Sequence, residues 1–225
     1  MEWWTSIPHT QLLLFVGLAY IGIFGLLSRT RHEMLSLQFA VEGLLITLGA
    51  VVLSAVGRPV NPILFFFILY TVTMRARWLA DLGNLLVARR RYRDGMVAFN
   101  VALSLWPDVL SRRIVEINKA VAFLRLGYLE RAREMLEGIL RTADKDGLAP
   151  KHVAAVHYNL GIIARAQGEE ERAKAHFRQA VEVAPHTIYG YGAMQALSGK
   201  PLATRRGKNQ DAQERPEPPD MDVLP

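Results

Sequence analysis

The chain has no cysteine, and its first third carries almost no charge. Without thiols the protein can form neither a disulfide nor a thiolate metal site, which fits a reducing compartment. Only six charged residues precede Arg75: Glu2, Arg29, Arg31, Glu33, Glu42 and Arg58. The composition therefore changes abruptly near Arg75.

The positive charge of the chain belongs to its middle segment. Residues 75–198 contain 19 Lys or Arg against 13 Asp or Glu, which accounts for the whole net charge of +6. Nucleic-acid-binding proteins usually gather basic residues on one face with aromatic residues between them. Here acidic residues are interleaved with the basic ones, so we expect no nucleic-acid partner.

Three apolar runs lie before Arg75, at about residues 10–28, 34–56 and 60–74. The first two meet the length of about 20 residues that a membrane-crossing helix needs. No basic residue precedes the first run and no small-x-small site follows it before Arg29, so it should remain as an anchor. Trp3 and Trp4 precede this run, where indole rings favour the headgroup layer.

The third run is short, and the arginines decide whether it crosses. Arg29 and Arg31 follow the first run, only Arg58 follows the second, and Arg75 and Arg77 follow the third. Basic loops stay in the cytoplasm. We therefore expect three crossings of the cell (inner) membrane, with the N-terminus outside and the C-terminal half in the cytoplasm. Two crossings with a re-entrant third run would place that half outside.

Glu42 stands inside the second apolar run, where a carboxylate is costly and marks a site or a polar contact between helices. Burial in an apolar medium disfavours the charged form, so we expect a protonated Glu42 in contact with the first span. Tyr20 lies at a similar expected depth, and Gln38 is one turn away on the same helix. A structural staple and a proton-transfer group both remain open.

The first 74 residues also resemble a membrane-protein family. A glycine-rich first run that ends Gly22-Ile-Phe-Gly25 and an acidic second run are similar to the K-type small membrane subunit of complex I and related antiporters. That resemblance, over about residues 10–74, implies proton transfer by a glutamate in both the second and the third spans. The third run has aromatic residues and no carboxylate.

The C-terminal half contains an internal repeat. Two segments share identical spacings of small, aromatic and proline residues: Leu82, Gly83, Gly95, Phe99, Ala102 and Pro107 against Leu160, Gly161, Ala173, Phe177, Ala180 and Pro185. A third copy lies between them: Ala120, Gly127, Ala132, Leu136 and Ile139. Small residues at two fixed places let two helices approach closely, and a recurring period of about 34 residues indicates a helical array.

These positions resemble those of the tetratricopeptide repeat, and the resemblance implies an all-α solenoid. We expect a transmembrane domain at 1–75, a repeat domain at 76–198 with units at about 76–109, 113–146 and 154–187, and a disordered tail at 199–225. A capping helix at 187–197 should face the array with Tyr189, Tyr191, Met194 and Leu197. Asn61 as an N-cap and Pro62 at the first position predict one continuous helix from the third span into the first unit.

The family resemblance also implies where a partner binds. Ligands of such repeats lie along the first helix of each unit, which here gives a set of candidate contacts: Arg77, Asn84, Ile117, Val121, Leu124, Arg125, Tyr158, Ile162 and Arg165. Their arginines suggest a peptide with acidic character. The tail of the chain or the bilayer surface could also fill this groove.

No catalytic motif, metal site or cofactor site is recognisable in the sequence, so we expect no enzymatic activity. The sequence predicts a membrane-anchored scaffold or assembly factor that binds a protein or peptide. Its expected surroundings are the lipid bilayer, with a larger membrane complex left open. The alternative is an accessory subunit of an ion-translocating complex, with Glu42 in a proton path.

Overall fold

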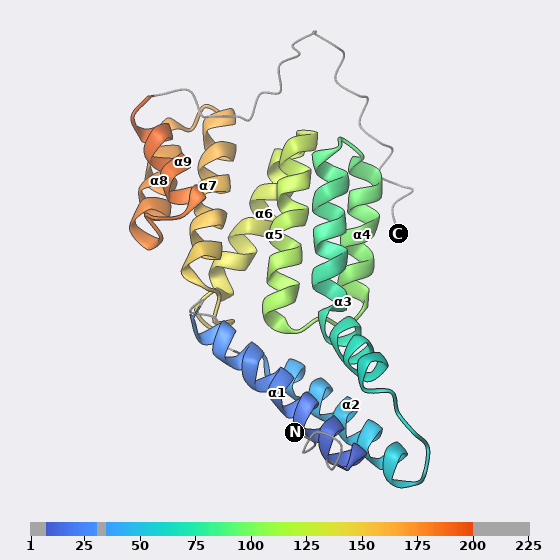
Figure 1. Ribbon diagram of the computed structural model, residues 1–225. Coiled ribbons are helices and arrows are strands. Elements are labelled where there is room, and N and C mark those ends of the chain that lie inside the picture. The colour runs from blue at the N-terminus through green and yellow to red at the C-terminus, as the bar shows by residue number, and fades with distance from the viewer. Residues whose placement is uncertain (1–7, 31–34, 200–225) are drawn as a thin grey trace.

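The computed structural model describes residues 8–30 and 35–199, and within them the protein is entirely helical. Figure 1 shows α1 (His9–Thr30), α2 (Leu37–Ala55) and the first part of α3 (Pro62–Ala88) at one end of the molecule. The remaining helices pack side by side at the other end: α4 (Tyr92–Ser104), α5 (Val109–Leu126), α6 (Leu129–Thr142), α7 (Pro150–Ala166), α8 (Glu170–Val183) and α9 (Ile188–Leu197). The all-α class is confirmed, while nearly all of the predicted tail, together with Trp3 and Trp4, lies outside the described residues.

The first three helices are each long and apolar enough to cross a membrane, by length and composition. α1 and α2 pack through small residues, because a Cβ at Gly17 would lie only 2.1 Å from Thr47 Oγ1. The buried Thr47 hydroxyl donates to the carbonyl of Gly43 at 2.7 Å, so it keeps a hydrogen bond in this apolar contact. Such close approach through small residues is typical of helix packing in membranes.

α3 runs without a break from Pro62 to Ala88, about 40 Å at 1.5 Å per residue. Its first turn is capped by Asn61, whose side chain accepts from the backbone N–H of Ile63 at 2.9 Å and of Leu64 at 3.2 Å. The prediction of one helix shared by the third apolar run and the first repeat unit is confirmed. This helix crosses the expected domain boundary near Arg75, so no linker separates the two parts.

Figure 1 shows that α3 changes direction along its length. Two side chains near its middle donate hydrogen bonds to backbone carbonyls of the same helix. Thr73 Oγ1 donates to Leu69 O at 2.8 Å, and Arg75 Nη1 donates to Val72 O at 2.6 Å. Side chains that enter the carbonyl ladder in this way bend helices. The bend therefore has a local cause in the sequence of α3.

The repeat units are antiparallel helix pairs, α3 with α4, α5 with α6, and α7 with α8. In the first unit the ring of Phe99 fills the space over Gly83, where an added Cβ would lie 2.4 Å from the ring. Phe177 meets Gly161 in the same way at 2.6 Å in the third unit. The predicted pairing of small and aromatic positions is thus the packing rule of both outer units.

The middle unit replaces glycine by alanine and leucine by lysine, yet its core is closed. Ala120, Ala132 and Leu136 are fully buried. The ammonium of Lys119 is half-buried and donates to Asn100 Oδ1 of α4 at 2.6 Å. Burial lowers the pKa of Lys119, and the nearby charge of Arg131 lowers it further. A polar contact between units thus occupies the place where the repeat pattern expects leucine.

The capping helix α9 forms as expected but presents a different face. Gly190, Ala193 and Ala196 are its buried residues, and a Cβ at Gly190 would lie 2.4 Å from the carbonyl oxygen of Ala184. Of the four residues expected to face the array only Tyr189 does so, since Tyr191, Met194 and Leu197 are exposed. The expectation for those three was wrong because small residues permit closer packing than large ones.

Candidate functional site

A partly buried ion pair joins the apolar helices to the repeat domain. Glu42 is the sixth residue of α2, and its carboxylate accepts from Arg75 of α3 through two bonds, from Nη1 at 2.6 Å and from Nη2 at 2.9 Å. Gln38, one turn earlier on α2, donates to Glu42 Oε1 at 2.9 Å. About three quarters of each charged side chain is shielded from solvent, with 24% of Arg75 and 26% of Glu42 exposed.

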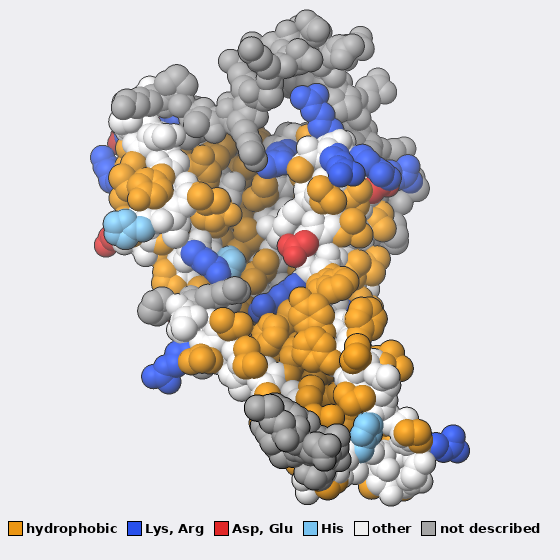
Figure 2. Space-filling model, in the orientation of Figure 1, with side chains coloured by type: hydrophobic (Ala, Val, Ile, Leu, Met, Phe, Trp, Pro, Cys, Tyr) orange, Lys and Arg blue, Asp and Glu red, His pale blue; other side chains and the backbone are white. Residues whose placement is uncertain are grey.

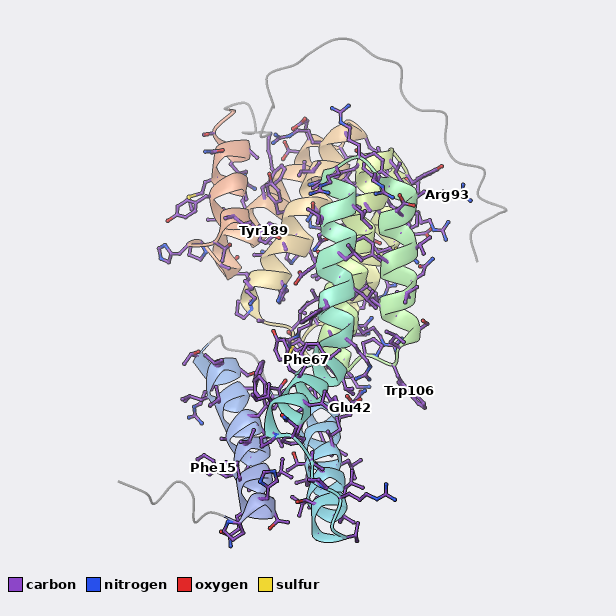
Figure 3. The ribbon with its side chains drawn as sticks, turned by 45° about the vertical axis from the view of Figure 1, so that its right-hand side comes forward. Phe15, Glu42, Phe67, Arg93, Trp106 and Tyr189 are labelled. Carbon is purple, nitrogen blue, oxygen red and sulfur yellow. The ribbon has the colours of Figure 1, made fainter. Side chains whose placement is uncertain are left out.

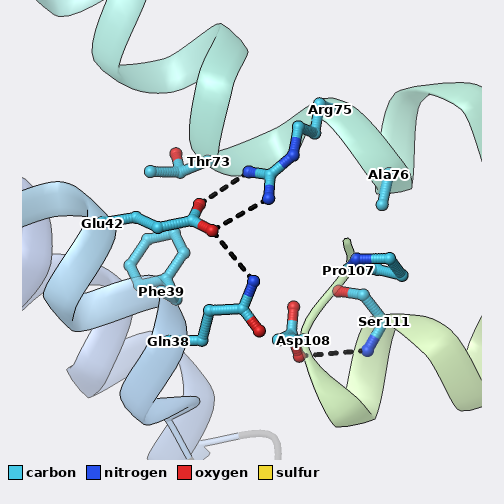
Figure 4. Close-up of a pocket in the computed structure, with 9 residues that line it drawn as sticks. All are labelled: Gln38, Phe39, Glu42, Thr73, Arg75, Ala76, Pro107, Asp108 and Ser111. Atoms are coloured by element: carbon cyan, nitrogen blue, oxygen red, sulfur yellow. Dashed lines mark hydrogen bonds and ion pairs between the residues drawn. The ribbon is translucent and has the colours of Figure 1, made fainter. Parts of the chain in front are cut away.

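Figure 4 shows the two bonds from Arg75 to Glu42. Arg75 also holds the loop between α4 and α5, because its Nε donates to the carbonyl of Leu105 at 2.9 Å and its Nη2 to that of Trp106 at 3.0 Å. With the two bonds to Glu42 and the one to Val72, all five guanidinium N–H groups have an acceptor. Gln38 Nε2 donates to the same Trp106 carbonyl at 2.7 Å. Arg75 therefore connects α2, α3 and the first loop of the repeat domain at a single point.

The loop held in this way has an unusual conformation. Trp106 has φ +54°, a left-handed value that is strained for a bulky residue, and its side chain is 79% exposed. Figure 3 shows it pointing away from the molecule at about the level of Glu42. Two apolar neighbours, Leu105 and Val109, are exposed beside it. Strain of this kind is kept only where surrounding contacts hold it, which here are the bonds to its carbonyl.

The structure corrects the expectation for Glu42 and Tyr20. The carboxylate of Glu42 bonds the guanidinium of Arg75 on α3 rather than the Tyr20 hydroxyl of α1. The Tyr20 hydroxyl instead lies 2.6 Å from Thr73 Oγ1 of α3. The expected depth was wrong because α2 begins at Leu37, so Glu42 stands in its second turn and Arg75 can reach it. Gln38, expected one turn away on the same helix, donates to Glu42 Oε1.

Arg77, one of the predicted partner contacts, lies beside the apolar helices rather than in an open groove. It borders a cavity of about 310 Å³ between α1 and α3. Its Nε donates to Ser111 Oγ at 3.5 Å, a long hydrogen bond to α5. The cavity is lined by Phe24, Leu27 and Ser28 of α1 and by Tyr70, Met74, Arg77, Trp78 and Asp81 of α3.

The other predicted contacts divide into two groups. Asn84 and Arg125 are exposed on the first helices of the first two units, and Val121 and Leu124 are half-buried beside Arg125. In the third unit the capping helix α9 covers the predicted contact positions of α7. Tyr158 packs against the rings of Phe177 and Tyr189.

Ile162 and Arg165 complete this occupied group. Ile162 packs into the core under α9. The Arg165 guanidinium lies 4.7 Å from the centre of the Phe177 ring and donates to the carbonyl of Ala196 at 3.0 Å. Of the candidate contacts, Asn84, Val121, Leu124 and Arg125 are therefore the ones open to a partner, whereas Ile117 is buried in the core of the repeat domain. The binding role of the four open residues stays a prediction.

A pair of histidines was missed from the sequence. His157 of α7 and His176 of α8 place their Nδ1 atoms 3.2 Å apart, so one ring donates to the other. Burial lowers the pKa of His157 to about 4, and the neighbouring His176 adds to this effect. Burial also lowers the pKa of His176. The two residues are 19 positions apart in the sequence, one on each helix of the same repeat unit. This spacing is the signal that could have found them.

Among the described residues, no third metal ligand joins these two histidines. Across residues 8–30 and 35–199 no group of three or more His, Cys, Asp or Glu side chains is placed to hold a metal ion. His176 borders a second cavity, of about 240 Å³, whose other charged residues include Arg133, Glu137 and Glu169. Arg133 bonds both Glu169 and Gln167 there, and so ties α6 to the next unit.

Residues 111–186 match the tetratricopeptide repeat family model. This segment begins in α5 and ends before α9, so it contains the second and third units. No curated protein and no solved structure matches the chain. The repeat region identified from the sequence is confirmed, and the first unit repeats its geometry at Gly83 and Phe99. Proteins with such repeats typically act as protein-interaction scaffolds rather than as enzymes.

Proposed function

Because residues 111–186 form a tetratricopeptide repeat region, we propose that the protein is a membrane-anchored scaffold that holds a protein partner at the cytoplasmic face of the cell membrane. The observation that carries this proposal is that α3 is continuous from Pro62 to Ala88. One helix belongs both to the apolar bundle and to the first repeat unit, and Arg75 ties it to α2 and to the α4–α5 loop. A partner bound to the repeats would therefore be held at a fixed angle to the bilayer.

The positions of the helix ends support the proposed orientation of the protein in the membrane. The C-terminal end of α1, the N-terminal end of α2 and the middle of α3 are on the side of the repeat domain (Figure 1). Arg29 stands at this end, whereas the opposite loop carries only Arg58. Basic residues favour the cytoplasmic side. This supports a cytoplasmic repeat domain and an external N-terminus.

The surface proposed for the partner is the exposed part of α3 and α5. Arg125 is exposed in the last turn of α5, with Val121 and Leu124 half-buried on the same helix, and Asn84 is exposed on α3. An arginine beside apolar groups suits a peptide that combines apolar and acidic residues. α9 covers the equivalent part of α7, so the partner is expected on the first two units.

The test compares two arginines of the same unit. Arg125→Glu should reduce the amount of co-purifying protein, while the matched control Arg141→Glu, an exposed arginine in the last turn of α6, should leave it unchanged. Resistance of the chain to alkaline extraction from membranes tests the anchor separately. Unchanged recovery with Arg125→Glu would reject this surface, and extraction by alkali would reject the anchor.

The alternative of a proton path through Glu42 gains no support from the geometry. Both carboxylate oxygens are bonded to Arg75, and Gln38 adds a third bond. A carboxylate held by a cation in this way favours its charged form. A joining role is the better account of this residue.

A further inference from the structure

The cavity between α1 and α3 has apolar walls at the end of the bundle that faces the repeat domain. Phe24 and Leu27 come from the last part of α1. Tyr70 and Trp78 come from α3, with their rings edge to face at 5.7 Å. Figure 2 shows hydrophobic side chains gathered over this part of the molecule, below basic and acidic ones. Aromatic rings at this position are typical of the interface between the acyl chains and the headgroups.

One cation, Arg77, lines this cavity, and its terminal N–H groups are available to a ligand. Arg77 makes one hydrogen bond in the described part of the chain, from Nε to Ser111 at 3.5 Å. Its terminal nitrogens therefore have no partner among the described residues, in contrast to those of Arg75. A guanidinium with free terminal N–H groups matches the geometry of a phosphate.

One anion lines the same cavity, a single turn further from the apolar helices. Asp81 is exposed and is not ion-paired within the described residues. Residues four apart on a helix lie on the same side, about 6 Å apart along its axis. Along α3 the lining residues run from Tyr70 and Met74 through Arg77 and Trp78 to Asp81, so the cation and then the anion lie beyond the apolar end of the cavity at Tyr70.

This order mirrors a phospholipid whose headgroup ends in a primary amine: acyl chains, then phosphate, then ammonium. We propose that the cavity binds a lipid of the phosphatidylethanolamine class, with its phosphate on Arg77, its ammonium on Asp81 and its chains along the walls formed by α1 and α3. This inference rests on the proposed membrane anchor. It assigns the cavity a ligand class and gives Arg77 and Asp81 a shared role.

The same groups disfavour other lipids. Phosphatidylglycerol carries a negative charge with no ammonium to offset it, so Asp81 would repel it, and its neutral hydroxyl groups could donate only weaker hydrogen bonds to that carboxylate. The quaternary ammonium of phosphatidylcholine has no N–H to donate to Asp81. A free phosphate would leave the apolar walls unused. The selectivity should therefore come from Asp81 and the retention from Arg77.

The test uses the full chain in detergent micelles with equal amounts of phosphatidylethanolamine, phosphatidylcholine and phosphatidylglycerol that share the same acyl chains. Native mass spectrometry measures which lipid stays bound. We expect about tenfold more phosphatidylethanolamine than either of the others, the effect of one charge-assisted hydrogen bond. Arg77→Gln should lower the retention of all three lipids. Asp81→Asn should remove the preference for phosphatidylethanolamine over phosphatidylglycerol.

Arg89→Gln is the matched control, because Arg89 is exposed just after the last turn of α3 and lies outside the cavity. It should leave lipid retention unchanged. Arg77→Lys keeps the charge and should keep most of the retention, which separates loss of binding from loss of fold. Retention that survives Arg77→Gln, or an unmodified chain that prefers phosphatidylglycerol, would overturn the inference. A chain that alkali extracts from membranes would instead overturn the anchor on which the inference rests.

Discussion

The guanidinium of Arg75 and the carboxylate of Glu42 form a two-point ion pair between helices that are 33 positions apart in the sequence. Arg75 adds three backbone carbonyls to this contact, at Val72, Leu105 and Trp106. A single side chain thus fixes α2, α3 and the α4–α5 loop relative to one another. We therefore expect Arg75, together with the continuous helix α3, to set the angle between the apolar bundle and the repeat domain.

Replacing Glu42 by Gln should therefore destabilise the protein. The guanidinium would remain in place with its charge uncompensated, and a hydrogen bond to a charged group contributes about 1–3 kcal/mol. We expect a lower free energy of unfolding by that amount, measured with denaturant in detergent micelles. Glu171→Gln removes the exposed pair with Lys174 and should cause no measurable change.

A double-mutant cycle tests whether the loss of stability in Glu42→Gln comes from the ion pair with Arg75. Arg75→Gln combined with Glu42→Gln should destabilise the protein by less than the sum of the two single changes, because no unpaired charge remains. Additive effects would mean that the pair contributes no energy of its own. The joining role of the pair would then be rejected.

The contrast between Glu42 and the repeat positions shows what the sequence can determine. Gly83, Phe99, Gly161 and Phe177 recur at one spacing, and local geometry alone forces their pairing. The partner of Glu42 comes from another helix, so it depended on where α2 starts and on the bend of α3. Neither is readable from hydrophobicity, because the apolar residues Met34 and Leu35 precede the Ser36 N-cap at which α2 starts.

The capping helix illustrates the same limit at a finer scale. Its range was predictable from the Thr187 cap, whose hydroxyl accepts from the Gly190 N–H at 3.2 Å. The buried face of α9 was not predictable. Whether large or small residues face the array depends on how closely the loop between α8 and α9 approaches the helix. The carbonyl of Ala184 comes near enough that only glycine fits at Gly190.

The contact between Gly83 and Phe99 gives a prediction for the first repeat unit. Gly83→Ala would place a methyl group 2.4 Å from the Phe99 ring, and overpacking of this kind costs about 1–3 kcal/mol. Thermal unfolding should show the loss, and Phe99→Leu in the same chain should recover part of it. Gly138→Ala, where the nearest atom is the end of the Arg141 side chain at 3.5 Å, should be neutral or slightly stabilising. Equal effects at Gly83 and Gly138 would contradict the packing described here.

The histidine pair predicts a dependence of stability on pH. The pKa of His157 is about 4 in the folded protein against an ordinary value of 6.5, so the unfolded chain binds more protons between these values. The free energy of unfolding should therefore fall as the pH falls from about 6.5 towards 4, on the order of 1–2 kcal/mol for a partly solvated group. Unfolding curves collected across this range measure the effect.

Two replacements assign that dependence to the pair. His157→Gln should flatten the pH profile, whereas His186→Gln, at an exposed histidine before α9, should leave it as it is. Arg133 and Arg172 near His176 also oppose its protonation, while Glu137 favours it. A profile that keeps its slope in His157→Gln would mean that other groups cause the loss of stability.

The last prediction concerns Trp106. Its carbonyl lies 2.7 Å from the side-chain nitrogen of Gln38, the second residue of α2, so the loop stands at the level where this apolar helix begins. A side chain that is 79% exposed at that level should lie in the headgroup layer, which indole rings favour. In vesicles, a chain that keeps only Trp106, with Phe at positions 3, 4 and 78, should lose about half of its emission to lipids brominated near the headgroup. The matched control moves the single tryptophan to Arg93, at the far end of α4 (Figure 3), where the same lipids should have no effect. If a water-soluble quencher such as iodide reaches Trp106 as readily as it reaches position 93, the loop stands clear of the bilayer, and only the apolar helices would then anchor the protein.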